Sequence, residues 1–302
     1  MEFDLQMSRA GFIGLNAMRP MNVRKSSSEF GKITIESLLK GADTKRAPGS
    51  AYARRHWEFT DDSYTCKEPG AEEPVDDREA EMYSDYFDAE VLAAERARDI
   101  VMRNFEKRVA DTLFNATTWS PTSVTTEWST AATATPVTDV EAGVKRLRAK
   151  GVKANALIIG WVPYRNLRLC SQITDIIAAS GAGGPIEPSV ITPQKLAEIF
   201  DLDYVLVGDA QEDTADEGLA ASLGEIWDDE YAAVCRIATT DNIRETCVGR
   251  TFHHSSDGSQ IGALVESYRD ETVRSDVVRA RMDTDEQVLH TVALDLLDNI
   301  TA

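Results

Sequence analysis

Apolar residues recur at steps of three and four over a long stretch in the first half of the chain. No glycine or proline occurs from residue 75 to residue 120. Asp76 or Asp77 can cap the start, and acidic residues fill the first turns, where the helix dipole favours them. The stripe consists of Tyr83, Phe87, Val91, Ala94, Ala97, Val101, Phe105, Val109 and Leu113. This pattern predicts one helix of about 35 residues, about 50 Å long, which needs an extended body to pack against.

Short helical and strand patterns alternate after residue 139. The predicted elements are helix 140–150, strand 156–160 (ALIIG), helix 163–179, helix 192–200, strand 204–208 (YVLVG), a short helix at 219–223 and a long strand over 225–239. Alternation of buried strands with helices predicts a compact α/β lobe around a central sheet.

The two ends of the chain have weaker periodicity. Residues 1–56 contain one short helical pattern at 33–40 and otherwise indicate an extended arm that needs a partner surface to become ordered. Residues 57–76 combine strand-like pieces with a Pro-Gly break, which predicts a two-stranded loop. Residues 261–297 favour long antiparallel strands beside the long helix, although charges interleaved with valines leave a helix open at 273–281.

Composition and charge narrow the function classes. The 302 residues carry a net charge of -19, which argues against nonspecific binding to nucleic acid or to anionic membranes, because both would repel the protein. The charge is also segregated. Residues 1–60 hold ten Lys/Arg and six Asp/Glu, whereas residues 61–90 hold twelve Asp/Glu and two Lys/Arg.

Two explanations of this charge map remain open. The first is two solvated faces of opposite sign. The second is that the basic arm of one subunit lies against the acidic stretch of another. The interface candidates on the second hypothesis are Arg24, Lys25, Lys45, Arg46, Arg54, Arg55 and Trp57 on one side, and Glu72, Glu73, Asp76, Asp77 and Glu81 on the other.

The sequence offers no convincing catalytic, cofactor-binding or metal-binding group. Its four cysteines include no C-x-x-C pair, and the His253-His254 pair has no metal-ligand spacing, so we expect reduced thiols and exposed histidines. The glycines at 181–184 follow a helix instead of a strand, unlike a phosphate-binding loop. The acidic run at 209–217 does not match an EF-hand and indicates a solvated or pore-lining loop. A signal peptide and a membrane-spanning apolar run are also lacking, so we expect a soluble protein that folds inside a cell.

The order of these elements and several short motifs carry a resemblance. The motifs are Asp88-Ala89-Glu90, 154–160 (ANALIIG), 190–192 (VIT), 196–200 (LAEIF), 204–208 (YVLVG), 225–227 (EIW) and 268–271 (YRDE). From about residue 50 onward the chain resembles the major capsid proteins of tailed phages with the Hong Kong 97-type fold.

The resemblance implies an α+β fold in four parts. These are an N-terminal arm (1–49), an extended two-stranded loop (50–76), a peripheral domain with a long spine helix and β-strands (77–138 and 256–302), and an α/β axial domain (139–255). It also implies pentamers and hexamers in an icosahedral shell that encloses double-stranded DNA without sequence-specific binding. A separate scaffolding protein and a portal are expected as partners, with assembly in the host cytoplasm, location in the virion, and no cofactor.

Two alternatives stay open at this point. An encapsulin-like nanocompartment would share the fold but enclose a protein cargo. A soluble α/β enzyme with an unrecognised site is the alternative from a different class.

Overall fold

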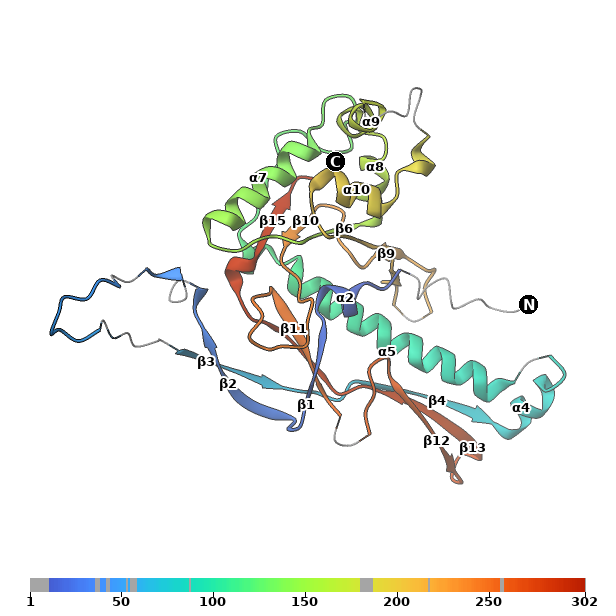
Figure 1. The fold of residues 1–302 in the computed structure, drawn as a ribbon. Helices are drawn as coiled ribbons and strands as arrows, with labels where there is room; N and C mark the ends of the chain where they lie inside the picture. Colours follow the sequence, from blue (N-terminus) through green and yellow to red (C-terminus); the bar gives the residue numbers. More distant parts are fainter. Residues whose placement is uncertain are drawn as a thin grey trace.

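A long helix, α5, runs through the middle of the molecule and contacts most of its other parts (Figure 1). A lobe of helices around a sheet lies above one end of it, a three-stranded sheet lies below the other end, and a β-hairpin extends to one side. This computed structural model describes residues 11–35, 39–41, 44–52, 54, 59–86, 88–179, 187–216, 218–255 and 258–301.

The predicted single helix of about 35 residues is wrong, because the chain forms two helices. α4 spans Asp77–Tyr83 and α5 spans Ala89–Leu113. Asp88 caps α5 by accepting hydrogen bonds from the amides of Glu90 and Val91 at 3.0 and 3.3 Å, and its extended backbone ends any continuous helix. Two members of the predicted apolar stripe, Tyr83 and Val91, are therefore exposed, and Phe87 lies outside the described residues.

A three-stranded antiparallel sheet covers the first half of α5. Its strands are β4 (Gly70–Asp76), β12 (Leu264–Asp270) and β13 (Ser275–Arg281), in the order β12-β13-β4. Val75 and Val278 on the inner face pack with Ala93 of α5. The prediction of antiparallel strands beside the long helix is confirmed here, and the alternative of a helix at 273–281 is excluded.

A five-stranded sheet forms the centre of the upper lobe. Its order is β5 (Thr122–Ser123), β15 (Leu294–Asp298), β10 (Ala232–Cys235), β6 (Ala156–Gly160) and β7 (Tyr204–Gly208). β6 and β7 are parallel and have the predicted bounds. Every residue of β6 is buried, as expected for a strand covered on both faces. The predicted strand at 225–239 is wrong in length, because only the four residues of β10 join the sheet.

Helices cover this sheet. They are α6 (Ala116–Trp119), α7 (Pro136–Ala149), α8 (Trp161–Leu167), α9 (Ser171–Ile177), the short 3-10 helix η2 (Pro188–Val190) and α10 (Pro193–Phe200). The predicted helix at 163–179 is wrong because it is interrupted before α9. There the Cys170 thiol lies against the Trp128 carbonyl oxygen at 3.4 Å, and the Ser171 amide donates to the Ala131 carbonyl at 2.9 Å. These tertiary bonds draw the backbone out of the helix.

A third sheet and a long hairpin lie on the side of α5 that faces away from the helical lobe (Figure 1). The short helix α2 (Gly14–Ala17) leads into β1 (Pro20–Val23), which pairs with β11 (Gly249–His254), and β11 pairs with β14 (Thr284–Val288). β2 (Ser27–Ile33) and β3 (Phe59–Thr65) pair over seven residues to form the hairpin. β8 (Gln211–Asp213) and β9 (Leu223–Glu225) form a small hairpin, and η3 (Thr291–Ala293) precedes β15.

Several strands pair across the predicted domain boundaries. β3 lies in the predicted extended loop but pairs with β2, which the sequence assigned to the arm. β4, in the same predicted loop, pairs with β13. β15, assigned with the peripheral strands, lies beside β10 in the lobe. The predicted helix at 33–40 begins at the last residue of β2, and its residues 36–38 lie outside the described residues. The predicted helix at 219–223 is wrong, since β9 begins at Leu223.

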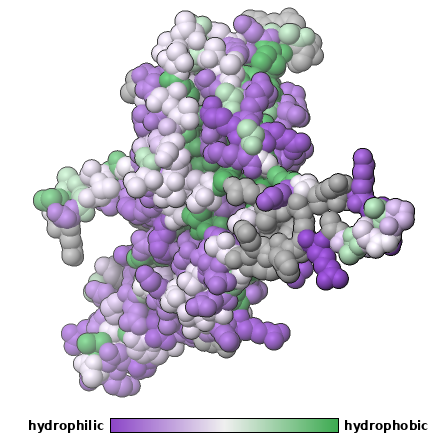
Figure 2. All heavy atoms as spheres, turned by 90° about the vertical axis from the view of Figure 1, so that its left-hand side faces the viewer, coloured by the Kyte–Doolittle hydropathy of each residue, from purple (hydrophilic) through white to green (hydrophobic). Residues whose placement is uncertain are grey.

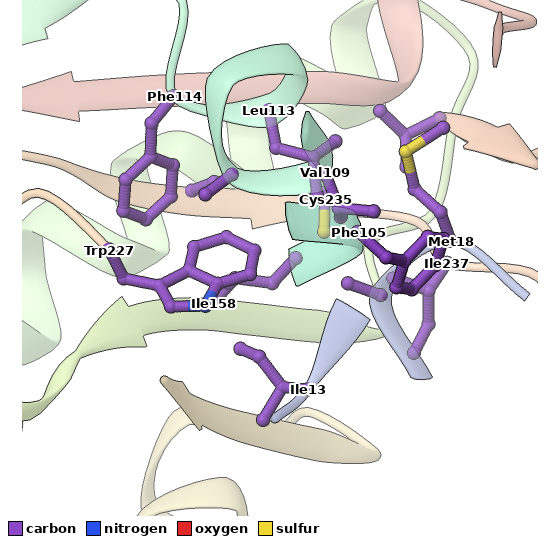
Figure 3. Packing of buried hydrophobic residues seen from close by; sticks show 14 of the residues in the cluster. Ile13, Met18, Phe105, Val109, Leu113, Phe114, Ile158, Trp227, Cys235 and Ile237 are labelled. Atoms are coloured by element: carbon purple, nitrogen blue, oxygen red, sulfur yellow. The ribbon is translucent and has the colours of Figure 1, made fainter. Parts of the chain in front are cut away.

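The main core lies where the second half of α5 packs against β6, the N-terminal segment and the chain around Trp227 (Figure 3). Phe105 and Leu113 of α5 are fully buried there with Ile158 of β6 and with Trp227. The Trp227 ring meets the Phe114 ring edge-on at 5.1 Å between centroids. One element thus contributes to the cores of both the lobe and the lower sheet.

Replacing the helix cap tests the division of the predicted helix. Asp88→Ala removes the acceptor for two amides of α5 and should lower the free energy of unfolding by about 1 kcal/mol in equilibrium urea unfolding. Asp85→Ala, an exposed neighbour that caps no helix, should change it by less than about 0.5 kcal/mol. Equal effects of the two substitutions would contradict the cap.

Candidate assembly surfaces

The hairpin of β2 and β3 is fixed at its root and exposed at its tip. At the root, the rings of Tyr64 and Phe252 stack at 4.6 Å, and Phe30 packs on Phe252 at 5.4 Å. The Lys32 ammonium pairs with Asp62 at 2.7 Å and donates to the Leu289 carbonyl oxygen at 3.0 Å. These contacts join the root to β11 and to the chain after β14.

The tip extends away from the rest of the molecule (Figure 1). Leu39 is 65% exposed although its side chain lies beside Gly151 after α7, and Tyr52 is 70% exposed, so Tyr52 in particular has little cover in its own chain. The guanidinium of Arg46 lies 4.9 Å from the centre of the Tyr52 ring. The tip therefore presents exposed apolar groups together with positive charge.

The structure separates the basic candidates into two groups. Arg24 and Lys25 lie in the turn between β1 and β2, whereas Lys45, Arg46 and Arg54 lie toward the hairpin tip, and all five are exposed. Strand β2, about 20 Å long, runs between the groups. Arg55 and Trp57 lie outside the described residues. The candidates therefore do not form one continuous basic patch.

Most of the acidic candidates already have partners in their own chain. Glu73 pairs with Arg96 of α5 at 2.9 Å, Glu72 lies 3.7 Å from Arg279 of β13, and Asp77 binds Arg269 of β12 at 2.7 Å. Asp76 caps α4 by accepting from the Arg78 amide. Glu81 is exposed on α4.

A ladder of charges crosses the outer face of the lower sheet. Arg281, whose side chain is 12% exposed, binds Glu266 at 3.2 Å and Glu68 at 3.0 Å, and Arg279 binds the same Glu266 at 2.9 Å. Hydrogen bonds from Arg281 and then from Arg279 lower the pKa of Glu266. The charges on this face therefore pair largely with one another.

An acidic and apolar surface remains at the α4–α5 turn. Its acidic members are Glu79, Glu81, Asp85 and Glu90, which take part in no ion pair with any residue that the structure describes. Its apolar members are Met82, Tyr83, Tyr86 and Val91, which are 42 to 82% exposed. We call this set the helix-turn surface.

A second exposed apolar group lies at the far end of the lobe. Leu169, Ile176 and Val190 are 40 to 58% exposed there. Trp161, which is 38% exposed, lies instead beside α5 and the β8–β9 hairpin, and Arg165 lies over its ring at 5.5 Å. The glycines at 181–184 lie outside the described residues. Seen from the hairpin side, the molecule is largely hydrophilic, with small scattered hydrophobic areas (Figure 2).

An open groove of about 760 Å³ lies between α5, Trp161 and the β8–β9 hairpin. Lys107 pairs there with Glu212, and Arg103 donates to the Gln211 carbonyl oxygen. Within the described part of the chain, no group of three or more His, Cys, Asp or Glu is arranged to hold a metal ion. Glu212 of the acidic run thus forms an ion pair with the side of α5.

His253, His254, Cys66 and Cys170 lie largely in the interior of the protein. His253 was expected to be exposed, but it is 2% exposed on β11 and hydrogen-bonds Asn22 and Ser259 at 2.9 and 3.2 Å. His254 lies 3.2 Å from Asp283. Burial raises the pKa of the Cys66 and Cys170 thiols to about 11, which disfavours the reactive thiolate. None of these groups is prepared for catalysis.

One carboxylate beside the groove has a strongly shifted pKa. Burial, with the nearby charges of Glu225 and Asp228, raises the pKa of Asp229 to about 6. Glu225 Oε2 and Asp229 Oδ1 are both buried and make no hydrogen bond with the residues described. Two such oxygens near one another favour binding a proton.

Comparison with solved structures decides the fold. No protein-family model and no curated protein matches the sequence. A phage-related protein from Bordetella bronchiseptica RB50 superposes with a TM-score of 0.70 at 16% identity, covering 96% of this chain and 93% of that one. The capsid protein of cyanophage P-SCSP1u gives 0.59 at 10% identity, covering 95% and 87%. The chain has the Hong Kong 97-type capsid fold.

The fold also matches an encapsulin. The encapsulin SrpI of Synechococcus elongatus PCC 7942 gives a TM-score of 0.56 at 9% identity, covering 100% of this chain and 91% of that one. The predicted α+β class is confirmed. Among the described helices, none is both long and apolar enough to cross a bilayer.

Asp229 makes the stability of this capsid fold depend on pH. A pKa raised in the folded state means that folding takes up a proton. The resulting stability is fully present below the ordinary value of 3.8 and is lost as pH rises through about 6. Urea unfolding between pH 4 and pH 8 should show this loss, and Asp229→Asn should be less sensitive to pH over that interval. Unchanged pH dependence in the variant would contradict the assignment.

Proposed function

We propose that this chain is a structural shell protein, the major capsid protein of a tailed virus, and that it has no enzymatic activity. The proposal is carried by the extent of the structural match: the capsid fold accounts for nearly the whole chain and for nearly the whole of the capsid protein compared with it. Homo-oligomeric assembly follows from the same comparison.

The physical argument for assembly rests on the hairpin. Its root is packed on its own subunit, and Ile35 and Leu39 lie beside Gly151 after α7, whereas Tyr52 farther out is 70% exposed. A protruding element of one copy that docks on a different surface of the next makes a heterologous contact, which can close into rings. A stable contact of this kind buries about 1,600 Å². The hairpin and the surface that receives it would supply part of that area in every subunit.

We assign the parts of the shell subunit accordingly. The extended loop is the hairpin of β2 and β3, and the peripheral domain combines α4 and α5 with the sheet of β4, β12 and β13. The axial domain is the five-stranded sheet with its helices, whose exposed end around Leu169, Ile176 and Val190 would meet its counterparts in pentamers and hexamers. Such a shell would enclose double-stranded DNA without reading its sequence, with a portal and a separate scaffolding protein as partners. It would assemble in the host cytoplasm and reside in the virion.

An encapsulin-like nanocompartment is the second candidate, and the match to a cyanobacterial encapsulin supports it. The two candidates differ in content. Particles isolated from the native source should contain nuclease-protected DNA if the shell is a capsid, and an enclosed protein if it is a nanocompartment.

The size of the purified protein tests the proposal. Light scattering after size exclusion should detect particles of several megadaltons, and negative-stain micrographs should show closed shells. A monomer or small oligomer at all concentrations, with no particles on the grid, would contradict a shell protein and favour the remaining alternative of a soluble enzyme.

The charge map leads to a second proposal, that the hairpin tip of one subunit docks on the helix-turn surface of another. The tip is basic and the helix-turn surface is acidic, and both expose apolar groups. The original acidic candidates on β4 are satisfied within their own chain, so of these candidates Glu81 is the one we retain. Electrostatic complementarity would set the register of the contact.

Charge reversal at the tip tests this contact. The triple variant Lys45→Glu, Arg46→Glu and Arg54→Glu should lower particle yield roughly tenfold, the equivalent of about 1.4 kcal/mol, while circular dichroism of the subunit is unchanged. The control reverses three other exposed basic residues, through Lys67→Glu, Lys145→Glu and Arg244→Glu, and should assemble normally. Normal yield from the tip variant would sink the proposed contact.

A further inference from the structure

One buried carboxylate joins three separate segments of the chain. Glu106 lies in the middle of α5 and is 1% exposed. Its Oε1 accepts hydrogen bonds from the Ile13 amide at 2.8 Å and from the Trp227 indole at 2.7 Å, and its Oε2 accepts from the Gly14 amide at 2.7 Å. The N-terminal segment, the long helix and the chain between β9 and β10 therefore meet at a single side chain.

This carboxylate has no cation to compensate its burial. Within the described residues, no Lys, Arg or His pairs with Glu106, and its neighbours on α5 are engaged elsewhere, Arg103 with Asp99 and Lys107 with Glu212. A buried charge of this kind is costly unless hydrogen bonds satisfy it. Burial raises the pKa of Glu106, and the three donors oppose that shift. Removing any one donor leaves the buried carboxylate with fewer hydrogen bonds, so that its burial costs more free energy.

The fit around the carboxylate is tight from the N-terminal side. A Cβ atom on Gly14 would lie 2.6 Å from Glu106 Oε2 and 3.1 Å from the Phe105 ring. The same segment is held a second time at Gly11, whose carbonyl oxygen accepts from the Asp209 amide at 3.2 Å. Residues 11–18 thus dock in one defined position, with Ile13 among the core side chains (Figure 3).

The fit is equally tight from the side of Trp227. A Cβ atom on Gly208 of β7 would lie 2.1 Å from the indole ring, and Phe114, the residue that follows α5, packs against the ring on another side. The indole therefore cannot shift without moving either the edge of the five-stranded sheet or the end of α5. A displacement of the Glu106 carboxylate would therefore be transmitted to the lobe through the Trp227 ring.

We propose that residues 11–18 form a latch that closes on Glu106 and thereby couples the N-terminal segment to the junction between α5 and the five-stranded sheet. With the latch closed, the three donors satisfy the carboxylate and hold Trp227 in place. With the latch open, the Glu106 charge recruits water, and the indole loses its fixed acceptor. Coupling between two sites is reciprocal, so loosening Trp227 must also loosen residues 11–18.

Hydrogen exchange measured by mass spectrometry tests the latch in both directions on the purified full chain. Gly14→Ala should accelerate exchange roughly tenfold in residues 11–18 and also in residues 223–231. The control Asn16→Ala, an exposed position in the same segment, should accelerate neither. If Gly14→Ala accelerates only residues 11–18, the segment is merely frayed and the coupling is refuted.

The reciprocal variant removes the other donor. Trp227→Phe should accelerate exchange in residues 11–18 to a similar degree. Its matched control is Trp128→Phe, which removes an indole that donates to Asp139 at 3.0 Å in a different core, and which should leave residues 11–18 unchanged. Unchanged exchange in residues 11–18 of Trp227→Phe would overturn the proposal, and this arm decides the question even if Gly14→Ala does not fold.

Discussion

The burial of helix α5 is the constraint on which the rest of the structure depends. A 25-residue helix is too long for any one small sheet to cover, and its buried positions run from Ala93 to Leu113. The lower sheet covers its first half, while β6, Trp227 and the N-terminal segment cover its second half. The segments that meet on it come from both ends and from the middle of the chain, so the subunit folds as one unit around this helix.

The same arrangement leaves the outer part of the hairpin without cover. β2 and β3 are anchored by the Tyr64–Phe252 stack and by Lys32, and Ile35 and Leu39 lie beside Gly151, but Tyr52 farther out is 70% exposed. Exposed Leu39 and Tyr52 therefore remain available to another molecule. In a shell subunit, this division is functional: a self-sufficient body provides stability, and a protruding element provides the connection to neighbours.

Local patterns predicted the elements whose limits are set locally. The strands β6 and β7 and the helix α10 follow from apolar runs and from the Thr192 cap, and the structure has them at the predicted positions. The division between α4 and α5 depends on which of several acidic residues acts as a cap, and Asp88 looked like one more residue in a helical run. The pairing of β2 with β3, and of β15 with β10, depends on contacts between distant residues that periodicity does not contain.

The interface candidates show the same limit. A charge map sums residues along the chain, and it could not see that Glu72 and Asp77 would meet Arg279 and Arg269 about 200 positions later. The importance of Glu106 was not predicted, for a different reason. In the sequence it is one acidic residue within a helix, and its role arises only from the three hydrogen-bond donors that the fold brings to it.

The most direct test of a shell built from linked subunits is a cryo-electron microscopy reconstruction of the assembled particle. The account predicts a closed icosahedral shell in which the hairpin of residues 27–65 crosses onto a neighbouring subunit. A particle without such a shell, or one in which every hairpin is packed entirely on its own subunit, would contradict it.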